Sequence, residues 1–183
     1  MQNLSSNIRI SVTESVFLKD PETSEIGRNI ISKGIDLLVE LGYEQFTFKK
    51  LATKIQTTEA SIYRYFESKH MLLTYLIHWY WGWQEYRLVI HLSNVECPTE
   101  RIKKAIKVFA QSEFVGDESS LFNLKNLQEL VITDSTKLYL TKDVDVENQA
   151  GYFAPYKRIV NRLSQIVLEI NPTYRYPHML IST

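Results

Sequence analysis

The chain has 183 residues, and its 44% hydrophobic content is ample for one or two modest domains with their own cores. Its 21 Lys and Arg balance its 21 Asp and Glu, which argues against a non-specific DNA-coating protein of the histone type. The only cysteine, Cys97, excludes an intrachain disulfide and fits a reducing compartment. No cleavable leader begins the chain, and Met71 to Trp83 is shorter than the roughly 20 residues of a membrane span. We therefore expect a soluble, cytoplasmic protein with no membrane partner.

The first predicted elements are an extension and a long helix. Within the N-terminal extension of residues 1–19, Ile8, Ile10 and Val12 alternate with polar residues, which indicates an extended segment. Asp20-Pro21 and Ser24-Glu25 then provide helix start signals. The apolar stripe from Ile26 to Leu41 predicts a helix that stops at Gly42.

Two short helices around a turn are predicted between Thr47 and Lys69. Thr47 is placed as the N-cap of the first helix, and Thr58 as the N-cap of the second. Helical spacing brings the apolar side chains together on a buried stripe, namely Phe48, Leu51, Ala52, Ile55, Ile62 and Phe66. The pattern is that of a helix-turn-helix, which presents its second helix to the DNA major groove. A plain helical hairpin is the alternative.

The outward face of the second helix favours DNA. Hydroxyl and cationic side chains that suit phosphate contacts are expected there: Ser61, Tyr63, Arg64, Tyr65 and Lys69. The stretch from Lys49 to Lys69 holds five basic and two acidic residues, so it is locally positive on a neutral chain.

These residues closely resemble the DNA-binding domain of the tetracycline-repressor (TetR) family over about Glu25 to Leu73. The matching positions are Gly42-Tyr43, Phe46-Thr47, Leu51-Ala52, the run from Thr58 to Phe66, and Ser68-Lys69. One departure lies in the turn, where the family usually places Gly and this chain has Gln56.

The resemblance implies roles for individual residues. Four are expected to hold the DNA backbone: Thr47, Tyr63, Tyr65 and Lys69. The first turn of the second helix is expected to enter the major groove, with Lys49 and Arg64 flanking it. That turn consists of Thr58, Glu59, Ala60 and Ser61. Glu59 either accepts a hydrogen bond from a cytosine amino group or only favours the helix dipole, and both interpretations stay open.

A long helix from Lys69 to about Leu92 is predicted next, nearly apolar all round in its first half, as in a helix that is buried or shared between domains. Its aromatic side chains either pack a core or line a cavity for a small apolar or aromatic effector. The candidates for effector binding are Tyr75, Trp79, Trp83 and Tyr86.

Further helices are predicted from Pro98 to Ala110, from about Ser119 through Val131, and from about Gln149 to Ile170. The stretch from Asp134 to Asn148 is expected to be a loop with at most one short helix. TetR-like proteins usually carry one or two more long helices after the helix that ends near Ile170, so the chain is either truncated or dimerises through fewer elements. The best remaining self-complementary surface, unless it is core, is the stripe of Phe153, Tyr156, Val160, Leu163 and Val167.

The sequence contains none of the common catalytic, metal-binding or phosphate-binding motifs. Neither HExxH, Cys/His ligand spacing, a GxSxG elbow, nor a glycine-rich phosphate loop occurs. We therefore expect no catalytic residues, no metal and no cofactor. Three hypotheses stay open: a ligand-responsive regulator, a helix-turn-helix protein with a C-terminal protein-interaction module and no effector, and a helical enzyme whose site the sequence hides.

The sequence thus predicts an all-α protein with an N-terminal extension (1–19), a three-helix DNA-binding domain (20–68) and a helical effector-binding and dimerisation domain (69–183). The resemblance implies a homodimeric repressor of a palindromic double-stranded DNA operator. A small, largely apolar effector would release it.

Overall fold

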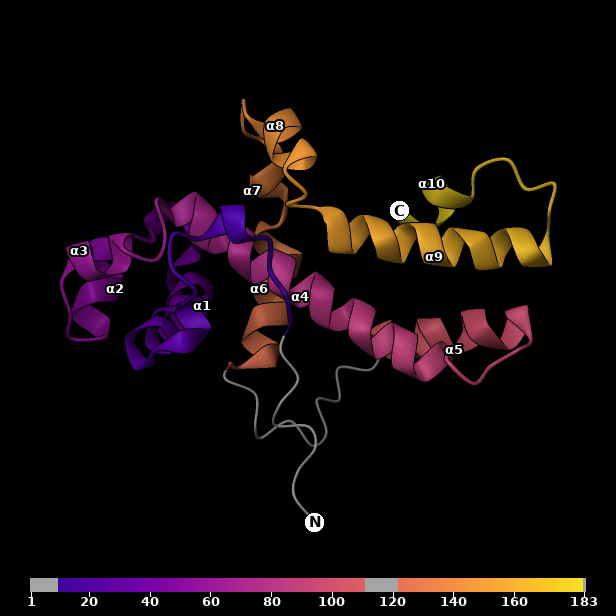
Figure 1. The fold of residues 1–183 in the computed structure, drawn as a ribbon, viewed down its shortest axis with the longest axis horizontal. Helices are drawn as coiled ribbons and strands as arrows, with labels where there is room; N and C mark the ends of the chain where they lie inside the picture. Colours follow the sequence, from indigo (N-terminus) through magenta and orange to yellow (C-terminus); the bar gives the residue numbers. More distant parts are fainter. Residues whose placement is uncertain (1–9, 111–121, 183) are drawn as a thin grey trace, which may run out of the picture. The chain divides into compact units, whose positions relative to one another are not determined.

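Figure 1 presents the computed structural model, which describes residues 10–110 and 122–182. Every regular element in these two ranges is helical, which confirms the predicted all-α class. Two 3-10 helices come first, η2 (Glu14–Val16) and η3 (Pro21–Thr23). The α-helices follow in order: α1 (Glu25–Gln45), α2 (Phe48–Lys54), α3 (Glu59–Tyr63), α4 (Lys69–Leu92), α5 (Pro98–Ala110), α6 (Leu124–Asp134), α7 (Thr136–Tyr139), α8 (Val144–Gln149), α9 (Ala154–Ile170) and α10 (Pro177–Ser182). None of the helices in these ranges has the length and hydrophobicity needed to cross a membrane.

The described residues form two compact units. The first unit comprises residues 10–80 and 122–152, and it therefore holds α1 to α3, the first half of α4, and α6 to α8. The second unit comprises residues 81–110 and 153–182, with the second half of α4, α5, α9 and α10. The predicted functional division after residue 68 stays a prediction.

Capping sets where α1 begins, and a glycine sets where it bends. The Ser24 hydroxyl accepts a hydrogen bond from the Gly27 backbone N–H at 3.1 Å. Gly42 has φ 75° and ψ 160°, a combination open essentially only to glycine. The regular helix therefore stops there, as predicted, and one further turn continues to Gln45. Gly27 also lets η3 approach α1, because a Cβ at this position would lie 2.2 Å from the Pro21 carbonyl oxygen.

The core of the first unit is formed by α1, α2, α3 and the first half of α4. Ile30, Leu51, Ile62 and Leu72 are all fully buried in it. Side chains of this size contribute roughly 1.5–3 kcal/mol each when removed from water, so their burial stabilises the packing of these helices.

Two predictions for the later part of the chain need correction. The segment from Asp134 to Asn148 holds two short helices, α7 and α8, and each is too short to show a hydrophobic period in the sequence. The last long helix, α9, begins later than predicted, because Gly151 adopts φ 87° just before it. The predicted helix from about Ser119 is observed as α6, and its expected first residues lie outside the described ranges.

The second unit has its own core. Two residues of α4 pack there with side chains from α5 and α9, and the cluster consists of Leu88, Leu92, Ala105, Ile159, Leu163 and Ile166. Ion pairs tie the same helices together, with Arg158 to Glu85 and Arg101 to Glu169 both at 2.7 Å. The final helix, α10, packs on α9 and was not predicted from the sequence.

Candidate nucleic-acid interface

The helix-turn-helix is formed by α2 and α3, and both of its predicted N-caps are confirmed. The Thr47 hydroxyl accepts from the Lys50 backbone N–H at 3.2 Å, and the Thr58 hydroxyl accepts from the Ser61 N–H at 3.2 Å. Each cap satisfies a backbone donor that the first helical turn leaves without an intrahelical partner. The starts of both helices are therefore fixed by their own side chains.

The turn between the helices has the hydrogen bonds of a Schellman motif. The Thr57 N–H bonds to the Ala52 carbonyl oxygen at 2.9 Å, and the Gln56 N–H bonds to that of Thr53 at 3.3 Å. Gln56 has φ 54°, the left-handed conformation that this position requires. The turn thus keeps its geometry without glycine, at a conformational cost.

The inward face of the motif is buried as predicted. Phe48 and Leu51 from α2 and Ile62 from α3 belong to the core. The Phe48 and Tyr63 rings also meet edge to face, with centroids 5.0 Å apart. This contact orients Tyr63 on the outside of α3, where 48% of the residue remains exposed.

Most of the predicted DNA-binding residues lie on the surface of the first unit. Ser61 is half-buried, with its hydroxyl 3.0 Å from that of Thr58. Neither the Lys49 nor the Arg64 side chain has a hydrogen-bond or ion-pair partner among the described residues. Their charges are therefore available to an external anion. The exposed members of the set are Thr47, Lys49, Thr58, Glu59, Ala60, Tyr63 and Arg64.

Tyr65 does not lie on the outward face, and this prediction is wrong. Only 4% of the residue is exposed, and its hydroxyl hydrogen-bonds to that of Ser24 at 2.7 Å. The reason is local: α3 ends at Tyr63, so helical spacing no longer places the residues that follow. Tyr65 instead ties the end of the motif to the start of α1.

Lys69 is held by the corner between α1 and α2. Its ammonium donates to the Tyr43 carbonyl oxygen at 2.9 Å, lies 4.4 Å from the Tyr43 ring centre, and has the carbonyl oxygens of Glu44 and Phe46 at 3.5 Å. Burial raises the pKa of the Tyr43 hydroxyl, with Glu44 and Glu147 adding to the effect, so the ring stays neutral. Sequence spacing did not predict this clamp, because its partners lie far apart in the chain.

The predicted effector residues are largely packed. Tyr75, Trp79 and Trp83 are buried, and Tyr86 is 36% exposed. The Tyr75 hydroxyl and the Trp79 indole N–H both donate to one carboxylate oxygen of Glu22, at 3.0 and 3.2 Å. These bonds connect α4 with η3 within the first unit.

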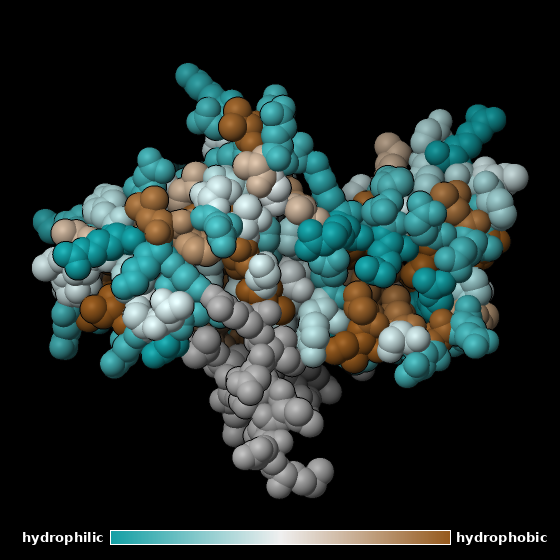
Figure 2. Space-filling model, viewed as in Figure 1, coloured by the Kyte–Doolittle hydropathy of each residue, from teal (hydrophilic) through white to brown (hydrophobic). Residues whose placement is uncertain are grey.

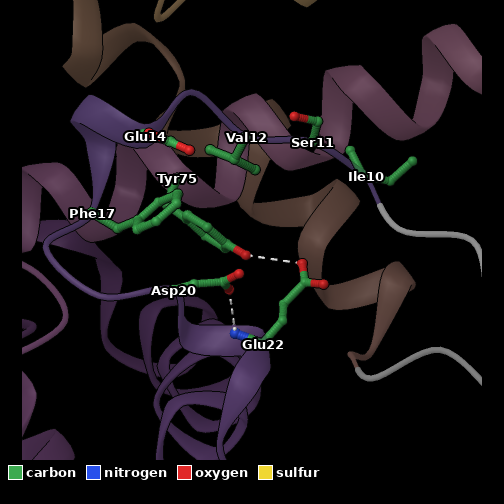
Figure 3. Close-up of a pocket in the computed structure, with 8 residues that line it drawn as sticks. All are labelled: Ile10, Ser11, Val12, Glu14, Phe17, Asp20, Glu22 and Tyr75. Atoms are coloured by element: carbon green, nitrogen blue, oxygen red, sulfur yellow. Dashed lines mark hydrogen bonds between the residues drawn. The ribbon is translucent and has the colours of Figure 1, made fainter.

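A pocket of about 380 Å³ lies beside Tyr75, and Figure 3 shows its hydroxyl pointing at Glu22. Its lining includes the carboxylates of Glu14, Asp20 and Glu22 together with Phe17. Three carboxylates therefore lie beside this ring, which does not suit the small, largely apolar effector predicted for it. Among the described residues, no group of three or more His, Cys, Asp or Glu side chains is arranged to hold a metal ion.

The stripe proposed for dimerisation lies largely inside the second unit. Phe153, Val160 and Leu163 are buried, and Tyr156 and Val167 are half-buried. The interpretation of this stripe as core is the one that the structure supports.

Comparison with known proteins identifies the fold of this interface. Residues 30–76 match the model of the bacterial regulatory proteins of the tetR family. The chain also resembles the crystal structure of AibR in complex with isovaleryl coenzyme A and operator DNA, with a TM-score of 0.64. The two share 16% sequence identity, and the match covers 85% of this chain and 80% of AibR, so it concerns the fold. No curated protein matches the chain.

Proposed function

We propose that this chain, which belongs to the tetR family by its DNA-binding domain, is a transcriptional repressor that acts as a homodimer on a near-palindromic operator. A small, largely apolar effector releases it from the DNA, and the protein works in the cytoplasm. The observation that carries the proposal is the capped first turn of α3, which is exposed beside unpaired cations.

The proposed contacts divide into two kinds. The first turn of α3, from Thr58 to Ser61, reads base edges, while Thr47 and Tyr63 bind phosphate oxygens. Lys49 and Arg64 flank the reading turn and supply positive charge. Because one such domain covers few base pairs, two copies on two half-sites are needed for useful selectivity.

Lys69 has two possible roles that salt dependence separates. A phosphate contact predicts that Lys69→Ala weakens binding equally on all sequences and lowers the salt slope by roughly one unit. The clamp on the Tyr43 carbonyl predicts weaker binding with an unchanged slope, because no counterion is then released at this position.

The effector is proposed to act through α4. This helix begins at Lys69 in the DNA-reading unit and ends at Leu92 in the second unit, so a ligand that moves it alters the spacing of the two reading heads. The AibR complex, with both an acyl coenzyme A and operator DNA, supports a ligand-responsive role for this fold. A helix-turn-helix protein with a C-terminal protein-interaction module and no effector is the alternative.

Mapping the interface tests the proposal. Duplexes selected from a random library would be titrated by fluorescence anisotropy with the wild type, Arg64→Ala and Lys125→Ala. Lys125 is an exposed residue on α6 and serves as the charge-matched control. We expect Arg64→Ala to lower the affinity at least tenfold and Lys125→Ala to leave it within twofold. Equal effects of the two substitutions would contradict the proposed interface.

A further inference from the structure

The second unit contains a groove of about 650 Å³ between α5, α9 and α10. Its principal lining residues are Ile102, Ile106 and Phe109 of α5, Leu163 and Val167 of α9, and Leu180 of α10. Ile106 is 62% exposed and Leu180 is 53% exposed, so the groove is open to solvent. Figure 2 shows hydrophobic residues in brown among hydrophilic residues in teal on the face of the molecule that it draws.

The lining of the groove restricts what it can bind. All nine residues that line it are apolar, so no side chain inside it offers a hydrogen bond or a charge. Its volume falls in the range of roughly 300–1,000 Å³ that is usual for small-molecule sites. A hydrocarbon chain can contact this apolar lining without leaving any polar group unsolvated. A polar head group must stay at the opening of the groove, where water or a surface charge can solvate it.

The net charge of the second unit as a whole favours an anionic head group. The described residues of the second unit carry nine Lys and Arg against four Glu, which leaves a net charge of +5 with His neutral, although the whole chain is neutral. On α5, Arg101 is paired with Glu169 and Lys103 with Glu100. The Lys107 ammonium has no hydrogen-bond or ion-pair partner in the described part of the chain.

Helix geometry places Lys107 at the rim. It directly follows Ile106 and lies three residues before Ala110, and both of these residues line the groove. Residues three apart share a helix face, so the Lys107 stem runs along the open edge of the lining. Lys104, three residues before Lys107, lies about half a turn from the middle of the α5 lining and is therefore farther from the groove than Lys107.

We propose that this groove binds the aliphatic tail of an anionic amphiphile, with its carboxylate or similar head group beside Lys107. The inference rests on the proposed function, because it names the chemical class of the effector. It also moves the effector site from the aromatic residues of α4 to α5, α9 and α10. A second copy of the chain could cover an apolar groove as well, but the excess of positive charge at this unit would oppose pairing of like faces.

Calorimetric titration of the full chain with alkyl carboxylates from hexanoate to dodecanoate tests the proposal. We expect the affinity to rise about fourfold per added methylene, as the transfer of each buried CH₂ predicts. Decanoate should bind more tightly than decyltrimethylammonium, which has the same tail and the opposite charge. Equal binding of the two, or no binding of either, would overturn the proposal.

Two pairs of variants locate the site. Ile106→Glu puts a carboxylate in the groove and should lower decanoate affinity at least tenfold, whereas Ile132→Glu, at an exposed isoleucine of α6, should leave it unchanged. Lys107→Glu should weaken decanoate by about fivefold but not decyltrimethylammonium, and Lys104→Glu should have a smaller effect on decanoate.

Sedimentation and operator binding complete the test. If Ile106→Glu converts a dimer into a monomer and decanoate does not bind the wild type, a second copy covers the groove and the proposal is wrong. Operator affinity of the ligand-free protein is measured separately. If the ligand-free protein does not bind an operator, the proposed repressor function is wrong. If it binds an operator but not decanoate, only the present inference is wrong.

Discussion

The helix-turn-helix buries its large aliphatic side chains, whereas the groove of the second unit leaves several of its own exposed to solvent. In α2 and α3, Leu51 and Ile62 are fully buried, and the polar groups at the helix starts are capped. In the groove, Ile106 and Leu180 are more than half exposed and have apolar neighbours without polar partners. The packed core of the helix-turn-helix keeps its outer surface in one conformation, as DNA binding requires. The exposed apolar groove is stabilised only when a ligand or another apolar surface covers it.

Truncating one aliphatic residue in each region should give the largest contrast. Leu51→Ala should lower the free energy of unfolding by about 2–5 kcal/mol, because it leaves a cavity in a closed core. Ile106→Ala should cost less than about 0.5 kcal/mol, because that side chain is already largely in water. Urea denaturation of both variants measures the difference. Similar losses would mean that the groove is covered in solution.

Substitution of Gly42, where α1 bends, should have the next largest effect on the stability of the DNA-binding domain. Gly42→Ala should cost about 2–3 kcal/mol from backbone strain alone, because no atom lies within 4 Å of the added Cβ. Gly34→Ala is the control within the regular part of α1, where the added Cβ meets Leu72 at 3.4 Å, an ordinary van der Waals contact, and alanine improves helix propensity by up to about 1 kcal/mol. Thermal unfolding of the pair compares alanine at a positive φ with alanine at a helical φ. Equal stability of the two variants would refute strain at Gly42.

The turn should show the smallest effect, and in the opposite direction. Gln56→Gly should raise the free energy of unfolding by about 1 kcal/mol, because glycine adopts the left-handed conformation without the steric cost that Gln56 carries. Chemical denaturation measures the change, with Gln56→Ala as a control that keeps the strain. A loss of stability in Gln56→Gly would show that the glutamine side chain contributes a contact that offsets its backbone cost.

The same contrast explains what could be predicted from the sequence. The caps at Thr47 and Thr58 and the stripe around Leu51 depend on residues within one or two helical turns, so their spacing predicts them. Tyr65 was misplaced because α3 ends before it, and a helix end is the least certain feature of a periodic pattern.

The remaining features depend on distant parts of the chain. The Lys69 ammonium binds backbone carbonyl oxygens at the end of α1. Every residue has such a carbonyl, so the sequence does not indicate which ones are bound. The groove needs α10, a short helix outside every predicted element, to lie against α5 and α9. The groove forms where three helices that are distant in the sequence pack together. The periodicity of a single helix contains no information about such packing.

Sequence-selective DNA binding by the ligand-free protein is the most direct test of the account. Wild-type protein would be titrated against its selected duplex and against a shuffled duplex of the same composition, at several salt concentrations. The account predicts at least a thousandfold preference for the selected duplex. It also predicts affinity that falls steeply with salt, as phosphate contacts require. Equal affinity for the two duplexes, or no binding to either at low salt, would contradict it.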